Sequence, residues 1–305
     1  MNTYLGWQSG YTTNTGTNNT AVGVYALYAN SSGGFNTSVG SYSLPANSTG
    51  VNNTATGYAS LFTNLSGGNN TAYGYYSVYS NTTGSHNIGI GYNSLYANVN
   101  GDGNIAIGTS SGDVNDATSY CVFIGYDADQ NNTTDYFNST ALGSTSRITA
   151  SNQVRIGDAT RLSIGGFQNW SNISDGSIKK NVQSNVPGLD FIMQLNPVTY
   201  NLDITAINNK LKIPYDQKTS ASIETKSAIT YTGFIAQEVE AAAKNINYAF
   251  SGVDAPKNEN DLYALRYAEF VVPLVQAVKE QQMIIETQQS QIDKLIKEVE
   301  LLKNK

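Results

Sequence analysis

The chain has 305 residues and a formal net charge of −6, from 17 Lys and Arg against 23 Asp and Glu. This acidic balance argues against nucleic acid or an anionic membrane surface as the main partner. The single cysteine, Cys121, cannot form an intrachain disulfide, and the single histidine, His86, cannot supply a multi-histidine metal site, so we expect no metal and no cofactor. No apolar run reaches the ~18 residues of a membrane span, and Met1 to Gly10 lack the basic and apolar regions of a signal peptide, so we expect neither membrane insertion nor an export signal.

Charge is distributed unevenly along the chain. Residues 1–150 contain six Asp and one Arg, Arg147, but no Lys and no Glu. They are rich in Asn, Thr, Ser and Gly, and they hold 15 of the 21 Tyr. This composition alone would suggest a disordered segment, whereas an internal repeat would indicate a folded one.

A repeat of fixed length runs through this first half. An Asn followed four residues later by a Gly recurs every 17 residues, at Asn2/Gly6, Asn19/Gly23, Asn36/Gly40, Asn53/Gly57, Asn70/Gly74, Asn87/Gly91 and Asn104/Gly108. A Leu or Val lies four residues after most of these Gly residues, an Asn lies seven after them, and a second Gly lies ten after them. Gly125 continues the phase, and Gly143 and Gly157 follow at steps of 18 and 14. We therefore predict a repeat stalk over residues 1–126 and an irregular end of the stalk over residues 127–173.

The unit is too short for a βαβ motif and too polar for a helix pair. Asn87 to Gly91 and Asn104 to Gly108 alternate in polarity, which predicts a short strand with one buried face. The fold class is therefore mainly β, with turns stacked as a parallel β-roll or β-helix. The seventh-position Asn and the second Gly suit left-handed turn positions. One Leu and one or two small residues per turn make a thin core, so we expect several chains to share it.

Tyrosines lie outside the fixed apolar positions. Exposed aromatic side chains among Asn and Ser are typical of glycan-binding surfaces. The alternative is that these rings pack between chains or between turns.

The second half has ordinary composition and three informative segments. Ser174 precedes Lys179 by five residues, which could form a Ser–Lys dyad or simply an exposed loop. Tyr231 to Glu240 indicates a short strand entering a helix at about Ala236, with Val239 turned to a core. The C-terminus alternates spacings of four and three, which predicts a coiled coil; the alternative is a helix packed on its own domain. Its seam residues are Leu274, Val278, Gln281, Ile285, Gln288, Ile292, Leu295, Val299 and Leu302. β-Branched residues in alternate layers do not decide between dimer and trimer, and the β-roll argument favours a trimer.

The repeat resembles the head β-rolls of trimeric adhesins and the Asn-Thr-Ala-x-Gly repeats of phage fibre proteins. The segment 174–305 resembles the C-terminal intramolecular chaperone of phage tailspikes and tail fibres, the peptidase S74 family first described in endosialidases. The matching motifs are Ser174-Asp175 with Lys179, Asn181-Val182, Leu195-Asn-Pro-Val-Thr-Tyr200, Gly233-Phe234-Ile235-Ala236-Gln237-Glu238-Val239 and Tyr267 to Glu280. Gln153-Val-Arg-Ile-Gly157 is similar to the usual end of a fibre stalk just before such a domain.

The resemblance implies an α+β chaperone domain over residues 174–270 and a trimeric coiled coil over 271–305. It implies that the domain trimerises the chains, folds the stalk and then releases itself by cleavage between Ile173 and Ser174. Ser174 would be the nucleophile and Lys179 the base, while Gly176 and Ser177 replace bulky or basic residues common in the family. The protein would be a virion tail or head fibre, made in the host cytoplasm, that binds a cell-surface glycan or protein receptor.

Three alternatives stay open at this point. The chaperone could trimerise without cleaving, the stalk could be a glycan-degrading tailspike, or the chain could be a bacterial trimeric adhesin. A tailspike hydrolase would need clustered carboxylates, and only Asp113/Asp116 and Asp127/Asp129 are close in sequence. Because Asn2 is already in phase with the repeat, we expect the chain to be part of a longer fibre.

Overall fold

The computed structural model describes residues 1–114, 116–213 and 220–304. The chain divides into two compact units, each described by itself below. The first comprises Met1–Ile164, Asp203–Ser227 and Lys257–Asp261, and the second comprises Gly165–Leu202, Ala228–Pro256 and Leu262–Lys305.

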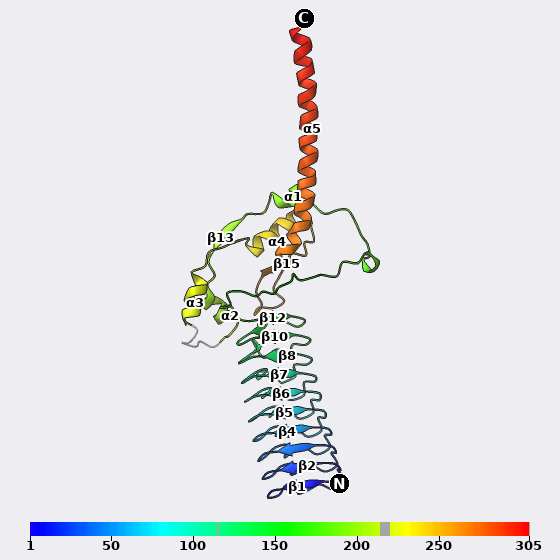
Figure 1. Ribbon diagram of the computed structural model, residues 1–305, viewed down its shortest axis with the longest axis vertical. Coiled ribbons are helices and arrows are strands. Elements are labelled where there is room, and N and C mark those ends of the chain that lie inside the picture. Colours follow the sequence, from blue (N-terminus) through cyan, green and yellow to red (C-terminus); the bar gives the residue numbers. More distant parts are fainter. Residues whose placement is uncertain (115, 214–219, 305) are drawn as a thin grey trace. The chain divides into compact units, whose positions relative to one another are not determined.

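The first unit is a β-solenoid, as the repeat predicted. Ten three-residue strands form one parallel sheet in which each strand pairs with the next, and they stack along one axis (Figure 1). They are β1 (Thr3–Leu5), β2 (Thr20–Val22), β3 (Thr37–Val39), β4 (Thr54–Thr56), β5 (Thr71–Tyr73), β6 (Ile88–Ile90), β7 (Ile105–Ile107), β8 (Val122–Ile124), β10 (Thr140–Leu142) and β12 (Val154–Ile156). Paired residues up to β8 are 17 apart, for example Tyr4 and Ala21. The last two steps follow the irregular spacing of the sequence, since Ala141 pairs with Phe123 on one side and with Arg155 on the other. A second, two-stranded parallel sheet joins β9 (Asp129–Gln130) to β11 (Arg147–Ile148).

Each turn encloses its own core within one chain. The central strand residue points inward and is small, as at Ala21 and Ala55, which are fully buried. A ladder of larger residues runs beside it, comprising Leu27, Leu44, Leu61, Val78 and Leu95, each at most 2% exposed. A second chain is therefore not needed to close this core. The expectation of an oligomer then depends on the second unit.

Buried asparagines supply the rest of the interior. The side chain of Asn36 donates to the carbonyl oxygen of Gly50 at 2.8 Å, and the backbone N–H of Asn36 donates to Asn19 Oδ1 at 2.8 Å. In a second ladder, Asn47 Nδ2 donates to Asn30 Oδ1 at 2.8 Å and to the Gly50 carbonyl at 2.9 Å. Each amide thus links one turn to the next, which satisfies polar groups that would otherwise be buried without partners.

The prediction that the seventh-position Asn and the second Gly adopt left-handed turns was wrong. The left-handed region is occupied instead by the first Gly, such as Gly23 with φ 138°, and by the ladder residues, such as Leu27 with φ 53°. The second Gly is required for space, because a Cβ on Gly33 would lie 2.3 Å from the carbonyl oxygen of Gly50 in the next turn. The Asn side chains are buried and bonded across turns, so they are not free to favour a local turn.

Many of the tyrosines stack from turn to turn. Tyr75 lies between Tyr58 and Tyr92, with ring centroids 5.2 and 5.6 Å apart and planes inclined by 18° and 12°. Tyr79 lies in the same way between Phe62 and Tyr96, at 5.0 and 5.1 Å. Of the two alternatives, packing between turns therefore holds for these rings. Their faces are covered by one another, although Tyr58, Tyr75 and Tyr92 remain 42–50% exposed.

Two short helices complete the first unit. Helix α2 (Ile204–Lys210) begins after Asp203, whose carboxylate accepts a hydrogen bond from the Ala206 N–H at 2.8 Å and so caps the helix. Helix α3 (Ser220–Ser227) packs on α2.

The second unit combines short strands with helices around an aromatic core. Strand β13 (Val198–Tyr200) pairs antiparallel with β14 (Tyr231–Gly233), and β15 (Val253–Asp254) pairs antiparallel with β16 (Ala264–Leu265). The helical elements are η1 (Gly176–Ile178), α1 (Leu189–Ile192), α4 (Ala236–Asn245), η3 (Tyr267–Phe270) and α5 (Val271–Lys303). Helix α4 begins at Ala236 and buries Val239, as the sequence predicted. Phe191, Val239 and Phe270 form the buried centre.

Candidate self-cleavage site and chaperone domain

The Ser174–Lys179 segment forms a closed turn. The single 3-10 turn of η1 reverses the chain, so that residues five apart meet. Lys179 Nζ donates a hydrogen bond to Ser174 Oγ at 2.7 Å. The two predicted catalytic side chains are therefore brought together by local geometry alone.

Asp175 holds this turn in shape. Its carboxylate accepts a hydrogen bond from the Ser177 N–H at 2.8 Å, which caps η1. The same hydrogen bond lowers the pKa of Asp175 below its usual value. The sequence analysis included Asp175 in the motif but predicted no role for it. Asp is a residue type that often caps a helix, and its place directly before the turn could have indicated this role.

The turn has room for a larger side chain at position 176. A Cβ added to Gly176 would meet no atom within 4 Å, and Gly176 does not have a positive φ. Neither space nor backbone conformation therefore requires a glycine at position 176.

The environment of the dyad is exposed to solvent. Every residue from 161 to 185 is exposed, including Ser174, Lys179 and Lys180. Apolar side chains in this stretch are exposed as well: Phe167 at 106%, Trp170 at 88% and Ile173 at 86%. A lysine acts as a general base only in its neutral form, which proteins reach by burial or by nearby positive charge. The single chain thus supplies the geometry of a dyad without the burial that would activate it.

In the motif Gly233 to Glu238, Gly233 is buried and Phe234 packs against the buried core of the second unit. The N–H of Phe234 donates to the Tyr267 hydroxyl at 3.1 Å, and Phe234 stacks on Phe270 with ring centroids 5.4 Å apart. A Cβ on Gly233 would lie 2.2 Å from the Tyr267 hydroxyl oxygen, so this position has no space for a larger residue. Two motifs far apart in sequence therefore meet here.

The other motif residues have simpler positions. Ala236 starts α4, and Gln237 and Glu238 are exposed in its first turn. Their exposure leaves them available to a partner.

Helix α5 packs on its own unit through its first turns. Pro273 and Ala277 are buried, α1 packs on α5, and Glu280 Oε2 accepts the Leu189 N–H at 2.7 Å. This hydrogen bond lowers the pKa of Glu280. The contacts between α1 and α5 therefore fix the first turns of α5 on the second unit.

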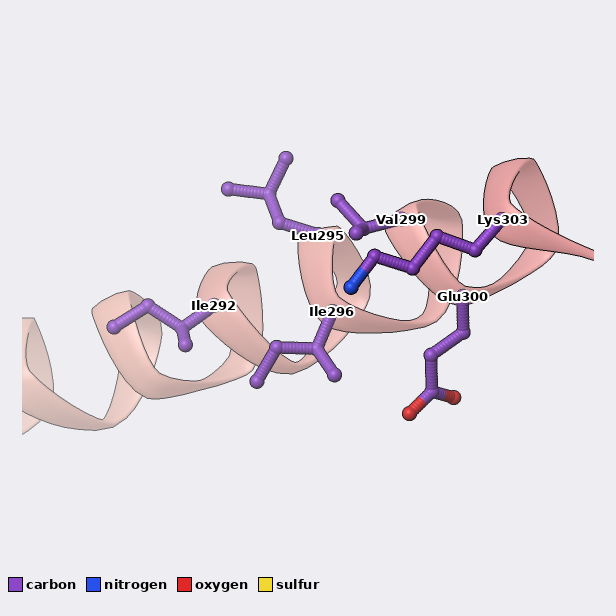
Figure 2. Close-up of a pocket in the computed structure, with 6 residues that line it drawn as sticks. All are labelled: Ile292, Leu295, Ile296, Val299, Glu300 and Lys303. Atoms are coloured by element: carbon purple, nitrogen blue, oxygen red, sulfur yellow. The ribbon is translucent and has the colours of Figure 1, made fainter.

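The rest of α5 presents the predicted seam to solvent. Residues 281–304 are all exposed, including the polar layers Gln281 and Gln288. The apolar seam residues are Leu274 at 50%, Val278 at 57%, Ile285 at 49%, Ile292 at 49%, Leu295 at 59%, Val299 at 48% and Leu302 at 69% exposed. Figure 2 shows the C-terminal part of this face, where Ile292, Leu295, Ile296 and Val299 project beside Glu300 and Lys303. The alternative of a helix packed on its own domain therefore holds only for the first turns.

Residues 174–248 match the family model of peptidase S74, described as the chaperone of endosialidase. The chain thus carries a chaperone-of-endosialidase domain. Curated proteins and solved structures gave no match to the chain. A β-solenoid stalk followed by this domain and a long helix is the organisation of a fibre with a C-terminal intramolecular chaperone. The family implies assembly of a trimer. No helix in the described ranges is both long and apolar enough to cross a membrane.

Proposed function

We propose that the chain is a phage fibre protein whose C-terminal domain trimerises three chains, folds their stalks and then releases itself by cleavage between Ile173 and Ser174. The observation that carries this proposal is the exposed apolar seam of α5 on a domain that matches the chaperone family. A helix with such a seam is stable when parallel copies bury it.

The coiled coil gives the chaperone its physical advantage. Parallel β-structure consists of pairings that are distant in sequence, so unaided folding is slow and exposes aggregation-prone edges. A C-terminal helix forms locally, brings three chains together and raises their effective concentration. The stalks then fold from chains already held in one register.

The cleavage chemistry follows from the Ser174–Lys179 pair. Neutral Lys179 takes the proton of the Ser174 hydroxyl as Oγ attacks the carbonyl carbon of Ile173. The Ile173–Ser174 C–N bond breaks, the proton passes to the leaving Ser174 amine, and an ester joins Ile173 to Oγ. Water then hydrolyses the ester, which leaves the Ile173 carboxylate and restores the hydroxyl.

Assembly would switch this chemistry on. In the single chain Lys179 is exposed and the apolar residues Phe167, Trp170 and Ile173 lie in solvent. Packing of three copies around this segment would cover these side chains and remove water from Lys179, which favours its neutral form. Cleavage would then be confined to assembled fibres, and loss of the chaperone would leave the stalk kinetically trapped.

The test is the intact mass under denaturing conditions of wild type beside Ser174→Ala, Lys179→Ala and a coil-breaking variant, Ile285→Asn. Pieces near 1–173 and 174–305 should appear in wild type only. A full-length mass for wild type would remove the protease and leave a trimerising chaperone. Efficient cleavage in Ile285→Asn would contradict the link to assembly.

We also propose that the protein is part of a virion and binds a glycan or protein receptor on the host surface. This proposal is based on the family match and the fibre organisation alone. Binding of the purified stalk to host cells would test it. The glycan-degrading alternative gains no support from the Asp127/Asp129 pair, because Asp127 is engaged by Arg147 at 2.6 Å and Asp129 is buried. Neither carboxylate is available to a bound polymer.

A further inference from the structure

The loop 257–261, which follows the matched residues 174–248 in the chain, lies against the last turns of the solenoid within the first unit. Its residue Asp261 is 6% exposed. The Asp261 carboxylate accepts hydrogen bonds from the Thr149 hydroxyl at 2.5 Å, the Gln153 side-chain amide at 3.4 Å and the Arg155 guanidinium at 3.4 Å. It also accepts the Lys257 N–H at 3.1 Å. One buried carboxylate thus joins three stalk residues to the loop 257–261.

Neighbouring residues of the loop extend this contact. Asn258 Nδ2 donates to the Thr149 carbonyl at 2.7 Å and to the Tyr136 hydroxyl at 3.4 Å. Asn131 Nδ2 donates to the Asn260 carbonyl at 3.1 Å. Elsewhere in the stalk, backbone carbonyls accept hydrogen bonds from a neighbouring turn, as the Ile148 carbonyl does from the Asn131 N–H at 3.1 Å. For the Thr149 carbonyl, the loop therefore takes the place of a further turn.

The open end of a solenoid presents unpaired hydrogen-bonding groups, which are costly when buried and prone to pair with other chains when exposed. We propose that the loop 257–261 is a template for the last stalk turn and that Asp261 is its positioning residue. This inference rests on the proposed chaperone function and names the contact by which the chaperone acts on the stalk.

The geometry makes the template selective for a finished turn. Thr149, Gln153 and Arg155 reach one carboxylate only when the chain between β11 and β12 has closed. A buried carboxylate without such partners is strongly unfavourable, so the loop and the turn stabilise each other. Because Asp261 lies beyond Ser174, this contact would also hold the two pieces together after cleavage until it is broken.

The experiment compares Asp261→Asn with the matched control Glu259→Gln in the full chain after refolding. In Asp261→Asn, an amide N–H group replaces one carboxylate oxygen and faces groups that are themselves donors. Glu259 is exposed, so Glu259→Gln changes a side chain in the same loop without removing such an acceptor. We expect amide hydrogen exchange in residues 149–156 to accelerate about tenfold or more in Asp261→Asn and to stay unchanged in Glu259→Gln. Equal exchange in the two variants would overturn the proposal.

A second pair covers the case in which Asp261→Asn does not fold. Thr149→Ser keeps the hydroxyl donor and should match wild type, whereas Thr149→Val loses it and should show the same acceleration. Identical behaviour of these two variants would also overturn the proposal. Failure of the wider chaperone function is separate: it would appear as normal stalk folding in a chain that lacks residues 174–305.

Discussion

The buried asparagine ladder can be tested by removing one amide from its middle. Asn64 is fully buried. Its Nδ2 donates to Asn47 Oδ1 at 2.8 Å and to the Gly67 carbonyl at 3.0 Å, and its Oδ1 accepts from Asn81 Nδ2 at 2.7 Å. Asn64→Ala removes all three hydrogen bonds and leaves Asn47 Oδ1 buried without this donor.

Three buried hydrogen bonds at about 1 kcal/mol each, with the added penalty for an unsatisfied acceptor, give a loss of about 3–5 kcal/mol in the free energy of unfolding. The control is Asn100→Ala, because Asn100 is exposed and outside the ladder, and its loss should be about 0.5 kcal/mol or less. Guanidinium unfolding followed by far-UV circular dichroism measures both values. Hydrogen exchange of the turns around residue 64 would detect unfolding confined to part of the stalk. A difference below about 1 kcal/mol between the variants would refute the view that the amide ladders replace apolar core.

Two further predictions concern the stalk carboxylates and the coiled coil. Burial raises the pKa of Asp129 well above its usual value, with Asp113 adding to the rise and Arg147 opposing it. Because the pKa of Asp129 is higher in the folded state, the stability contributed by its protonated form is complete below the unfolded-state pKa and is lost as the pH rises through the folded-state pKa. Thermal melts should therefore show a melting temperature that falls with rising pH in wild type, and this fall should be absent in Asp129→Asn. In the seam, Ile292→Asn should cost about 2 kcal/mol per chain and dissociate the proposed trimer at micromolar concentration, whereas Lys297→Asn, off the seam, should leave it intact in sedimentation runs. A trimer that survives Ile292→Asn would place the interface elsewhere.

The sequence predicted the architecture of the stalk better than its interior. A fixed period of 17 with alternating polarity specifies stacked parallel strands, and β1 to β8 follow it without a slip. Local residue preferences failed inside each turn. Leu27 adopts a left-handed conformation that Leu disfavours, because only there can its side chain fill the core. Tertiary packing overrides propensity at such positions.

At the candidate site, too, local features could be predicted from the sequence and long-range contacts could not. The Ser174–Lys179 contact is local, and the spacing of five raised it as one possibility beside an exposed loop. Asp261 contacts Thr149 across 112 residues, and no local pattern marks such a pair. The exposed loop was one of the two alternatives that this spacing left open, and the structure shows both dyad residues exposed.

A stalk of near-identical turns has a register problem that its own contacts do not solve. Any strand from β2 to β7 could pair with several others, since a slip of one repeat restores the same Asn and Gly positions. The last turns differ: the steps there are 18 and 14, Arg147 pairs with Asp127, and Asp261 binds Thr149. The contacts at this end define a unique pairing.

Folding is therefore expected to start at the C-terminal end of the stalk and to proceed turn by turn toward the N-terminus. Each completed turn offers the next strand one correct edge, so slipped pairings would not accumulate. Pulse-labelling hydrogen exchange during refolding should protect amides of residues 140–156 before those of residues 20–39. The Asp261→Asn variant should delay both, while Glu259→Gln should delay neither. If the N-terminal turns gain protection first, the stalk nucleates independently and the register is not set by its chaperone-proximal end.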